Sequence, residues 1–246
     1  MRNIQLTLAY DGTDFHGWQR QAGLRTVQQV LEDGLDQLTG TRTSTTACSR
    51  TDAGVHALGQ SVHFLTASIL PTETFVRALN AMLPLDLRVL NARERPQAFH
   101  ATLDARSKRY RYVIENAPIA SPFQLRYSWH VRRPLDVDEM ALGGRLLLGR
   151  HDFHSFETDW PNRMSSVRTI LDLSVERSGV FVTIEVEADG FLYNMVRSIA
   201  GTLVFVGNGK HPAAWVAEVL KAENRIEAGP TAPPQGLFLV AAHYAS

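Results

Sequence analysis

The chain has 246 residues, of which 44% are hydrophobic and 20% are charged, and its formal net charge is zero. This much apolar material can build a core, so a mainly disordered chain is excluded. The single cysteine, Cys48, excludes a disulfide framework and a metal cage built from cysteines. The longest uncharged apolar stretch, residues 198–209, is too short to cross a bilayer. We therefore expect a cytoplasmic protein without a membrane segment.

The first half of the chain predicts two helices and four strands. Its N-terminal residues alternate between apolar and polar, which indicates a strand and not a signal peptide. Farther along, Val27, Leu31 and Leu35 repeat with helical spacing, and Gly40 marks the end of that helix. In chain order, the predicted elements are strand 4–10, helix 27–38, strands 41–46 and 61–65, helix 72–82 and strand 87–92.

The second half repeats this pattern. Asp136 or Asp138 can cap a helix that Gly149 ends. Ser178 and Gly179 predict a turn between two strands. In chain order, the predicted elements are strand 110–114, a helix that reaches residue 148, strands 170–176 and 180–186, helices 194–205 and 212–220, and strand 237–242.

The duplicated element order predicts the fold class. Each half follows the order βαββαβ, the split βαβ arrangement of ferredoxin-like proteins. We predict an α+β protein with one half at residues 1–102 and the other at residues 103–246. The two ferredoxin-like halves are expected to form one extended mixed or antiparallel sheet, with helices on one face and a central cleft.

The charges are unevenly distributed, although their sum is zero. Residues 88–133 contain ten Lys and Arg residues against three Asp and Glu residues, whereas residues 134–246 contain nine against fourteen. Arginine also outnumbers lysine by 22 to 3, and its planar guanidinium binds phosphate through two hydrogen bonds. A lineage bias toward arginine would give the same count, so charge alone makes RNA binding plausible and no more.

The densest group of chemically capable residues lies at residues 50–60. It includes Arg50, Asp52, Gly54 and His56. Asp and Gly at this spacing also build ordinary turns, because Asp accepts backbone amides and Gly adopts a positive φ. Arg50 could equally be a solvated surface charge. The residues alone leave a turn and a reactive loop both open.

This loop is one of a series of motifs. It reads Arg50-Thr51-Asp52-Ala53-Gly54-Val55-His56-Ala57. The others are Tyr10-Asp11-Gly12-Thr13, Gly17-Trp18-Gln19, Thr26-Val27-Gln28, Leu83-Pro84, Phe99-His100-Ala101, Lys108-x-Tyr110-x-Tyr112, His151-Asp152-Phe153, Tyr193-Asn194-Met195-Val196-Arg197 and Gly236-Leu237. Together they resemble the tRNA pseudouridine synthase A (TruA) family, in family order and over nearly the whole chain.

The resemblance implies a set of active-site residues. It assigns the catalytic carboxylate to Asp52, which would attack the ribose of a flipped uridine or deprotonate it. Arg197 resembles the basic partner of that carboxylate, and Arg50 would hold the extruded nucleotide. Tyr110 matches the family tyrosine that stacks on uracil, and Leu237 an apolar residue beside the base. Tyr110 and Leu237 could also be ordinary core residues of strands.

The family also implies a substrate and partners. Its members form pseudouridine at positions 38, 39 and 40 in the anticodon stem-loop of tRNA, as homodimers. Breaking and remaking a glycosidic bond within one nucleoside needs no redox cofactor, metal or ATP, so the expected cofactor is none. Recognition of three neighbouring positions implies that RNA shape is recognised more than base edges.

Two departures from the family pattern are visible. Ser49 stands where we expect a glycine, which could alter the backbone before Arg50. Ala101 and Thr102 follow His100, where an arginine often sits, so a possible phosphate contact is lost. Neither departure affects the expected carboxylate.

Other functions and sites compete with this interpretation. An RNA-binding module with split βαβ units would carry an aromatic-rich strand motif, which is missing here. A glycoside hydrolase usually needs two carboxylates beside the bond, and residues 50–60 contain one. His151 and His154 at a spacing of three suggest a metal only weakly. Trp18 could serve the core or RNA, and His56 and His63 are expected to be structural.

Overall fold

The structure, a computed structural model, describes residues 1–158 and 165–245. The chain folds as two compact units. The first unit comprises Met1–Arg106 and Phe238–Ser246, and the second comprises Ser107–Leu237. The predicted α+β class is confirmed. The division into domains at residues 1–102 and 103–246 stays a prediction. The single extended sheet and the central cleft also stay predictions.

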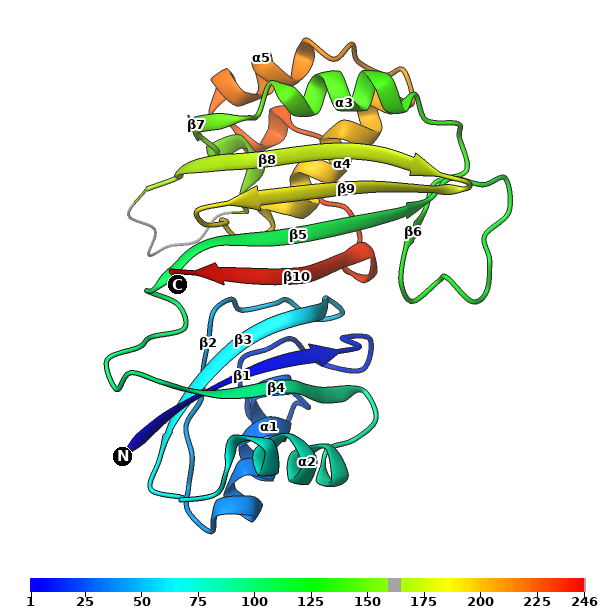
Figure 1. Cartoon of the computed structure of the whole chain (residues 1–246). Helices are drawn as coiled ribbons and strands as arrows, with labels where there is room; N and C mark the ends of the chain where they lie inside the picture. Colours follow the sequence, from blue (N-terminus) through cyan, green and yellow to red (C-terminus); the bar gives the residue numbers. More distant parts are fainter. Residues whose placement is uncertain (159–164, 246) are drawn as a thin grey trace. The chain divides into compact units, whose positions relative to one another are not determined.

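The first unit is built on the split βαβ pattern (Figure 1). Its sheet has the order β4-β1-β3-β10, and the short β2 pairs with β3 beside β10. β1 is antiparallel to β3 and β4, β2 is antiparallel to β3, and β10 is parallel to β3. The elements are β1 (Arg2–Tyr10), α1 (Val27–Thr39), β2 (Thr46–Ala47), β3 (His56–Thr66), α2 (Thr72–Met82), β4 (Leu87–Arg95) and β10 (Leu237–Tyr244).

One face of this sheet forms an apolar core with the two helices. Alternate residues of β1 are fully buried, as are the inward residues of α1 and α2. The Phe64 ring of β3 meets the Phe75 ring of α2 edge-on, with centroids 5.7 Å apart. The α1 helix begins where Thr26 Oγ1 accepts a bond from Gln29 N and ends at Gly40, whose φ is 69°. These local signals explain why this helix was predictable.

The other face of the sheet is polar, and residues 96–104 lie across it. The Asn3 side chain donates to the carbonyl of Phe99 at 2.8 Å, and Gln5 donates to Ser61 Oγ at 2.6 Å. The amide of Ala101 donates to His63 Nδ1 at 3.1 Å. His63 is therefore a structural residue, as expected, and it acts as an acceptor.

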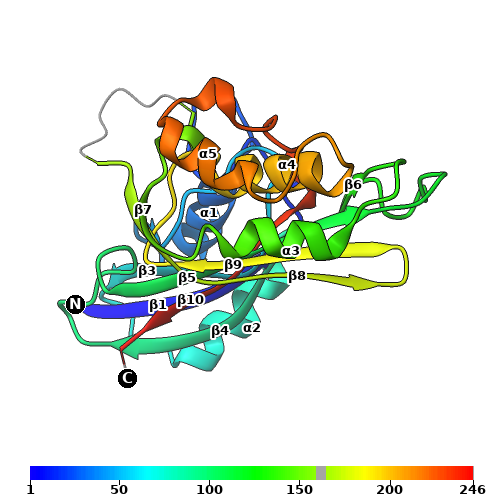
Figure 2. The same cartoon turned by 90° about the horizontal axis from the view of Figure 1, so that it is seen from above.

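The second unit contains a four-stranded antiparallel sheet with the order β5-β9-β8-β7. In Figure 2, its three helices lie on the same side of β8 and β9. The elements are β5 (Ala105–Glu115), β6 (Trp129–His130), α3 (Val137–Arg145), β7 (Gly149–Asp152), β8 (Val167–Ser178), β9 (Phe181–Ala188), α4 (Met195–Gly207) and α5 (Trp215–Ala222), with short 3₁₀ turns at His154–Phe156, Arg225–Glu227 and Pro234–Gly236.

Glycines allow α3 to approach its neighbours in this unit. A Cβ at Gly144 would lie 2.4 Å from the side chain of Leu173 on β8. A glycine also allows the chain after α5 to pass close to α4, because a Cβ at Gly201 would collide with the carbonyl of Pro230. Residues 229–232 therefore lie directly along α4. Within the described residues, no helix is long and apolar enough to cross a membrane.

The predicted strand 41–46 is wrong, because only Thr46 of that segment is in β2. Carboxylates of α1 bind its backbone instead: Glu32 accepts from Thr45 N at 2.9 Å, and Asp36 accepts from Thr43 N. These side chains replace the strand partner that the segment would need. The helix expected to reach residue 148 ends at Arg145. The short strands β6 and β7 were not predicted.

Candidate active site

The loop that carries Asp52 runs from Ser49 to Val55, and its first residues are held from β1 and β3. Gln60 of β3 donates to the carbonyl of Ser49 at 2.6 Å and accepts from its amide at 3.3 Å. The hydroxyl of Tyr10 lies 2.8 Å from Thr51 Oγ1. Burial raises the pKa of Tyr10 to about 12, so its hydroxyl stays protonated and remains a neutral hydrogen-bonding group.

The middle of the loop is held by the segment that follows β1. The amide of Trp18 donates to the carbonyl of Thr51 at 2.9 Å, and Gly54 N donates to the carbonyl of Phe15 at 3.3 Å. This close approach requires glycine at Gly12, since a Cβ there would lie 2.0 Å from the carbonyl oxygen of Val55. Two glycine-containing segments far apart in the sequence therefore fit together through their backbones.

Asp52 is the first residue of a tight turn. Val55 N donates to the carbonyl of Asp52 at 3.1 Å, and Gly54, the third residue of the turn, has a φ of 76°. A positive φ at this place is the signature of a type II turn, which favours glycine. Asp52 is half-buried and Arg50 is exposed. The turn and the reactive loop, which the sequence left open as alternatives, are thus compatible.

His56, which follows the loop, has a structural role. It is 1% exposed, its Nδ1 accepts from Gly12 N at 3.0 Å, and its ring stacks on Phe238 with centroids 4.6 Å apart. Ser49 does not strain the loop, because Asn194 and Glu223 are the only non-glycine residues with positive φ in the described chain.

Two buried aromatic residues lie on the segment whose main chain holds the loop. Phe15 and Trp18 are each 2% exposed, so Trp18 belongs to the core. The guanidinium of Arg25 lies 4.0 Å above the Phe15 ring and forms two hydrogen bonds to Asp86, at 2.8 and 2.9 Å. The hydrogen bonds that Arg25 donates to Asp86 raise the pKa of Arg25.

In the second unit, Arg197 lies in the first turn of α4. Its Nε donates to the carbonyl of Ala232 at 2.7 Å, and its Nη1 donates to Asn194 Oδ1 at 2.7 Å. A cation is unfavourable at a helix N-terminus, where the helix dipole is positive, so these two oxygens offset that cost. No sequence pattern pointed to Ala232, but the Asn-x-x-Arg spacing could have indicated Asn194.

Tyr110 and Leu237 also lie in the second unit. Tyr110 is on β5, is 5% exposed, and meets the Phe191 ring edge-on with centroids 5.0 Å apart. Leu237 begins β10 and is 6% exposed. The structure therefore brings Arg50 and Asp52 together on one loop of the first unit, and assigns Tyr110, Arg197 and Leu237 to the second.

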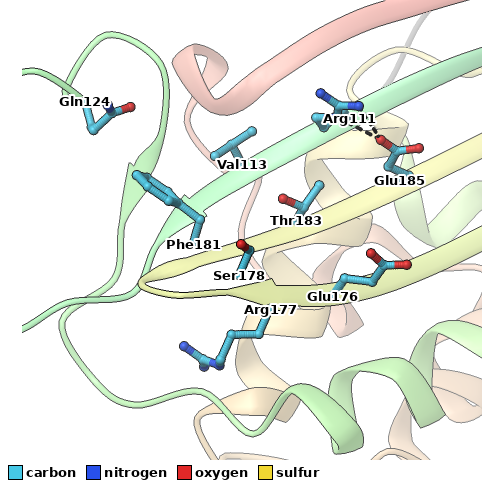
Figure 3. Close-up of a pocket in the computed structure, with 9 residues that line it drawn as sticks. All are labelled: Arg111, Val113, Gln124, Glu176, Arg177, Ser178, Phe181, Thr183 and Glu185. Atoms are coloured by element: carbon cyan, nitrogen blue, oxygen red, sulfur yellow. Dashed lines mark hydrogen bonds and ion pairs between the residues drawn. The ribbon is translucent and has the colours of Figure 1, made fainter.

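A separate pocket of about 460 Å³ opens on the helix-free face of the second unit's sheet (Figure 3). Arg111 and Glu185 form an ion pair at 2.7 Å within it. Burial would raise the pKa of Glu185, but hydrogen bonds from Arg111 and Arg109 outweigh burial and lower the pKa. The pocket contains none of the predicted site residues; its lining is Arg111, Val113, Gln124, Glu176, Arg177, Ser178, Phe181, Thr183 and Glu185.

The histidines once considered for a metal have other contacts. His151 Nε2 lies 2.8 Å from the carbonyl of Leu148, and His154 Nδ1 lies 3.1 Å from Glu157 Oε1. Among the residues that the structure describes, no three His, Cys, Asp or Glu side chains gather in a way that could hold a metal ion.

Comparison with known proteins defines the class of this chain. A family model described as tRNA pseudouridine synthase matches residues 7–119 and 145–245, and therefore both halves of the chain. The chain is a tRNA pseudouridine synthase, which is an isomerase.

Individual relatives narrow the class. The chain is 44% identical to tRNA pseudouridine synthase A of Thermoanaerobacter sp. (strain X514) over 98% of both chains. It is 45% identical to tRNA pseudouridine synthase A of Ruminiclostridium cellulolyticum over 99% of this chain and 100% of that one. With the same-named protein of Myxococcus xanthus it shares 46% identity over 99% of this chain and 92% of that one. The chain belongs to the tRNA pseudouridine synthase A family, as the motifs indicated.

A solved structure also matches, at a TM-score of 0.35 and 11% identity, over 84% of this chain and 54% of the other. Its title is "Structure of H/ACA RNP bound to a substrate RNA containing 2'-deoxyuridine". A likeness this weak supports no conclusion about the fold or the substrate.

Proposed function

We propose that this enzyme forms pseudouridine at positions 38, 39 and 40 in the anticodon stem-loop of tRNA, and that Asp52 is its catalytic carboxylate. In this reaction the N1–C1′ bond of uridine breaks and a C5–C1′ bond forms. The C5 proton leaves to water and N1 gains a proton, so product and substrate are isomers. Asp52 acts on the ribose, as a nucleophile at C1′ or a base at C2′.

The observation that carries the proposal is the support of Asp52. The main chain on both sides of it is bound by neighbouring segments, at Thr51 through Trp18 and at Gly54 through Phe15. A carboxylate on a rigid support keeps its orientation before the substrate arrives, which lowers the entropic part of the barrier. A turn with no catalytic role would not need this many anchors.

The other site residues have proposed roles toward the same uridine. Arg197 keeps the Asp52 carboxylate ionised and oriented. Arg50 binds the backbone of the extruded nucleotide, which must leave its stack to be reached. Tyr110 stacks on the uracil ring and Leu237 flanks it, so that the detached base is retained while it rotates.

The substrate and partners follow from charge and from the relatives. The basic segment of residues 88–133 would attract the tRNA backbone, so binding should weaken steeply as salt rises. We infer a cytoplasmic homodimer that needs no cofactor. In such a dimer, two basic segments create a local positive field although each chain is neutral.

The test uses unmodified tRNA tritiated at C5 of uracil. We expect tritium release into water with the wild-type protein and none with Asp52→Asn, and the products should contain pseudouridine at positions 38, 39 and 40. Wild-type protein that binds tRNA but releases no tritium would instead indicate a binding module. Release of free uracil would indicate a hydrolase. Product at other tRNA positions would refute the assigned target.

A further inference from the structure

The residue before α4 has an unusual backbone conformation. Asn194 has a φ of 61°, in the left-handed region, and is one of two non-glycine residues with positive φ in the described chain. Asparagine tolerates this region better than most residues, but glycine adopts it without steric cost. Strained residues of this kind persist where the surroundings fix them, and they cluster at functional sites.

The side chain of Asn194 does not serve the helix that it precedes. Asparagine is a favoured N-cap residue, yet here its side chain makes no capping hydrogen bond. Its Oδ1 accepts from Nη1 of Arg197 at 2.7 Å, and its Nδ2 donates to Thr158 Oγ1 at 2.9 Å. A guanidinium only donates, so the amide must present its oxygen to Arg197.

Two acceptors fix the plane of the guanidinium. One is Asn194 Oδ1 at Nη1, and the other is the carbonyl of Ala232 at Nε, which lies 2.7 Å away. Ala232 is fully buried and its amide donates to the carbonyl of Arg197 at 3.1 Å, so this acceptor is fixed by the backbone. Asn194 is the only one of the two acceptors that a side-chain substitution can remove.

We propose that Asn194 is a positioning residue that orients the guanidinium of Arg197 for catalysis, an inference that rests on the role given to Arg197 above. Thr158 in turn fixes the amide of Asn194, so that its oxygen faces the arginine. The residue acts through Arg197 and has no contact with the reacting atoms.

Because the backbone at Asn194 has a positive φ, a glycine substitution can distinguish a positioning role from a purely structural role. Asn194→Gly removes two hydrogen bonds but relieves the positive φ, which offsets part of that loss, so folding stability should fall only slightly. A purely structural asparagine would then be dispensable. A positioning asparagine would not, because a guanidinium that loses this acceptor samples more orientations and the reaction slows.

The experiment compares Asn194→Gly with Asn208→Gly, the same substitution at the other end of α4. For Asn194→Gly we expect a melting temperature only slightly below that of wild type, a tRNA Kd within about twofold of wild type, and a single-turnover rate about 10- to 100-fold lower. Asn208→Gly should retain the rate. Asn194→Asp, which keeps an oxygen acceptor, should retain more of the rate than Asn194→Gly.

Several results would overturn the proposal. One is a single-turnover rate within twofold of wild type for Asn194→Gly. Another is a loss of rate that is fully explained by the fraction of this variant unfolded at the assay temperature. The third is an Asn194→Asp variant that reacts no faster than Asn194→Gly. Arg197→Lys gives an independent check, since Asn194→Gly should cost much less in that background, and additive losses contradict the coupling. Wild-type and Asp52→Asn proteins in the same assay distinguish failure of the proposed function from failure of the role given to Asn194. If the wild type releases no tritium, the proposed function is refuted as well. If the wild type is active and Asp52→Asn is inactive, a negative result refutes only the role of Asn194.

Discussion

The loop of Asp52 and the first turn of α4, where Arg197 lies, fix the side chains proposed for catalysis in different ways. Around Asp52 the anchors are mostly main-chain groups, contributed by Thr51, Gly54 and Val55. Around Arg197 one anchor is a main-chain carbonyl and the other is the side chain of Asn194. A main-chain frame survives most single substitutions, whereas a side-chain anchor is lost with one. The two halves of the proposed site should therefore respond differently to mutation.

The largest effect is expected for Arg197→Ala. Removal of the guanidinium takes away the proposed cationic partner of Asp52, so we expect turnover to fall by about 10²- to 10³-fold or more. Affinity for tRNA should change little, because many phosphate contacts contribute to it. Single-turnover tritium release and filter binding measure the two quantities. Lost binding with a retained single-turnover rate would refute this role.

Gly12→Ala should break the frame around Asp52. The new Cβ would lie 2.0 Å from the carbonyl oxygen of Val55, so the loop must move. We expect a loss of about 1–3 kcal/mol in the free energy of unfolding and a drop of about 100-fold in turnover.

Gly23→Ala is the matched control for this change. Gly23 has a φ of 74°, and a Cβ there would meet nothing within 4 Å. The substitution should cost about 1–2 kcal/mol through backbone strain alone, with turnover retained. Similar losses of turnover in both variants would show that stability, and not loop position, determines activity.

Two tyrosine substitutions, with smaller expected effects, test the same difference between the Asp52 loop and the surroundings of Arg197. Tyr10→Phe removes a hydroxyl beside Thr51, and Tyr112→Phe removes a hydrogen bond of 2.7 Å to the carbonyl of Pro233, next to Ala232. Each should cost about 1 kcal/mol in the free energy of unfolding, measured by urea titration. Turnover should fall less for Tyr10→Phe, since other anchors hold its loop. The reverse order would contradict the comparison.

The smallest effect concerns pH and His63. Burial, and then the neighbouring His100, lower its pKa below the usual 6.5. The unfolded chain thus takes up a proton at a higher pH than the folded protein, and stability should fall as the pH drops below about 6.5. In His63→Gln the free energy of unfolding should depend less on pH between 7 and 5. An identical slope in both proteins would exclude this residue as the cause.

The regular elements of both units were largely predictable, because their signals are local. Helix α2 was predicted with its exact bounds of Thr72–Met82, and the helical spacing of Val27, Leu31 and Leu35 located α1. The strand predicted at residues 41–46 was wrong. Its alternating threonines favour a strand, and no local pattern shows that Glu32 and Asp36 bind its backbone.

The candidate site also contains residues with a local sequence signal and residues without one. Asp52 could be proposed because reactive residues crowd one short loop and match a family motif. The supports of that loop, such as Gln60 and Tyr10, come from other strands and leave no local pattern. The positive φ of Asn194 is equally invisible in the sequence, because asparagine occupies ordinary conformations as readily.

The backbone frame around Asp52 has a consequence for how such a protein can evolve. Hydrogen bonds from amides and carbonyls do not depend on which side chain a residue carries, so the positions beside the carboxylate can drift while the geometry is inherited. Ser49, which stands where a glycine is expected and has no positive φ, is compatible with such a change. Only the glycines that permit close contact, above all Gly12, resist exchange. The side chains at the rim of the proposed site can therefore differ without a change in how its centre is held.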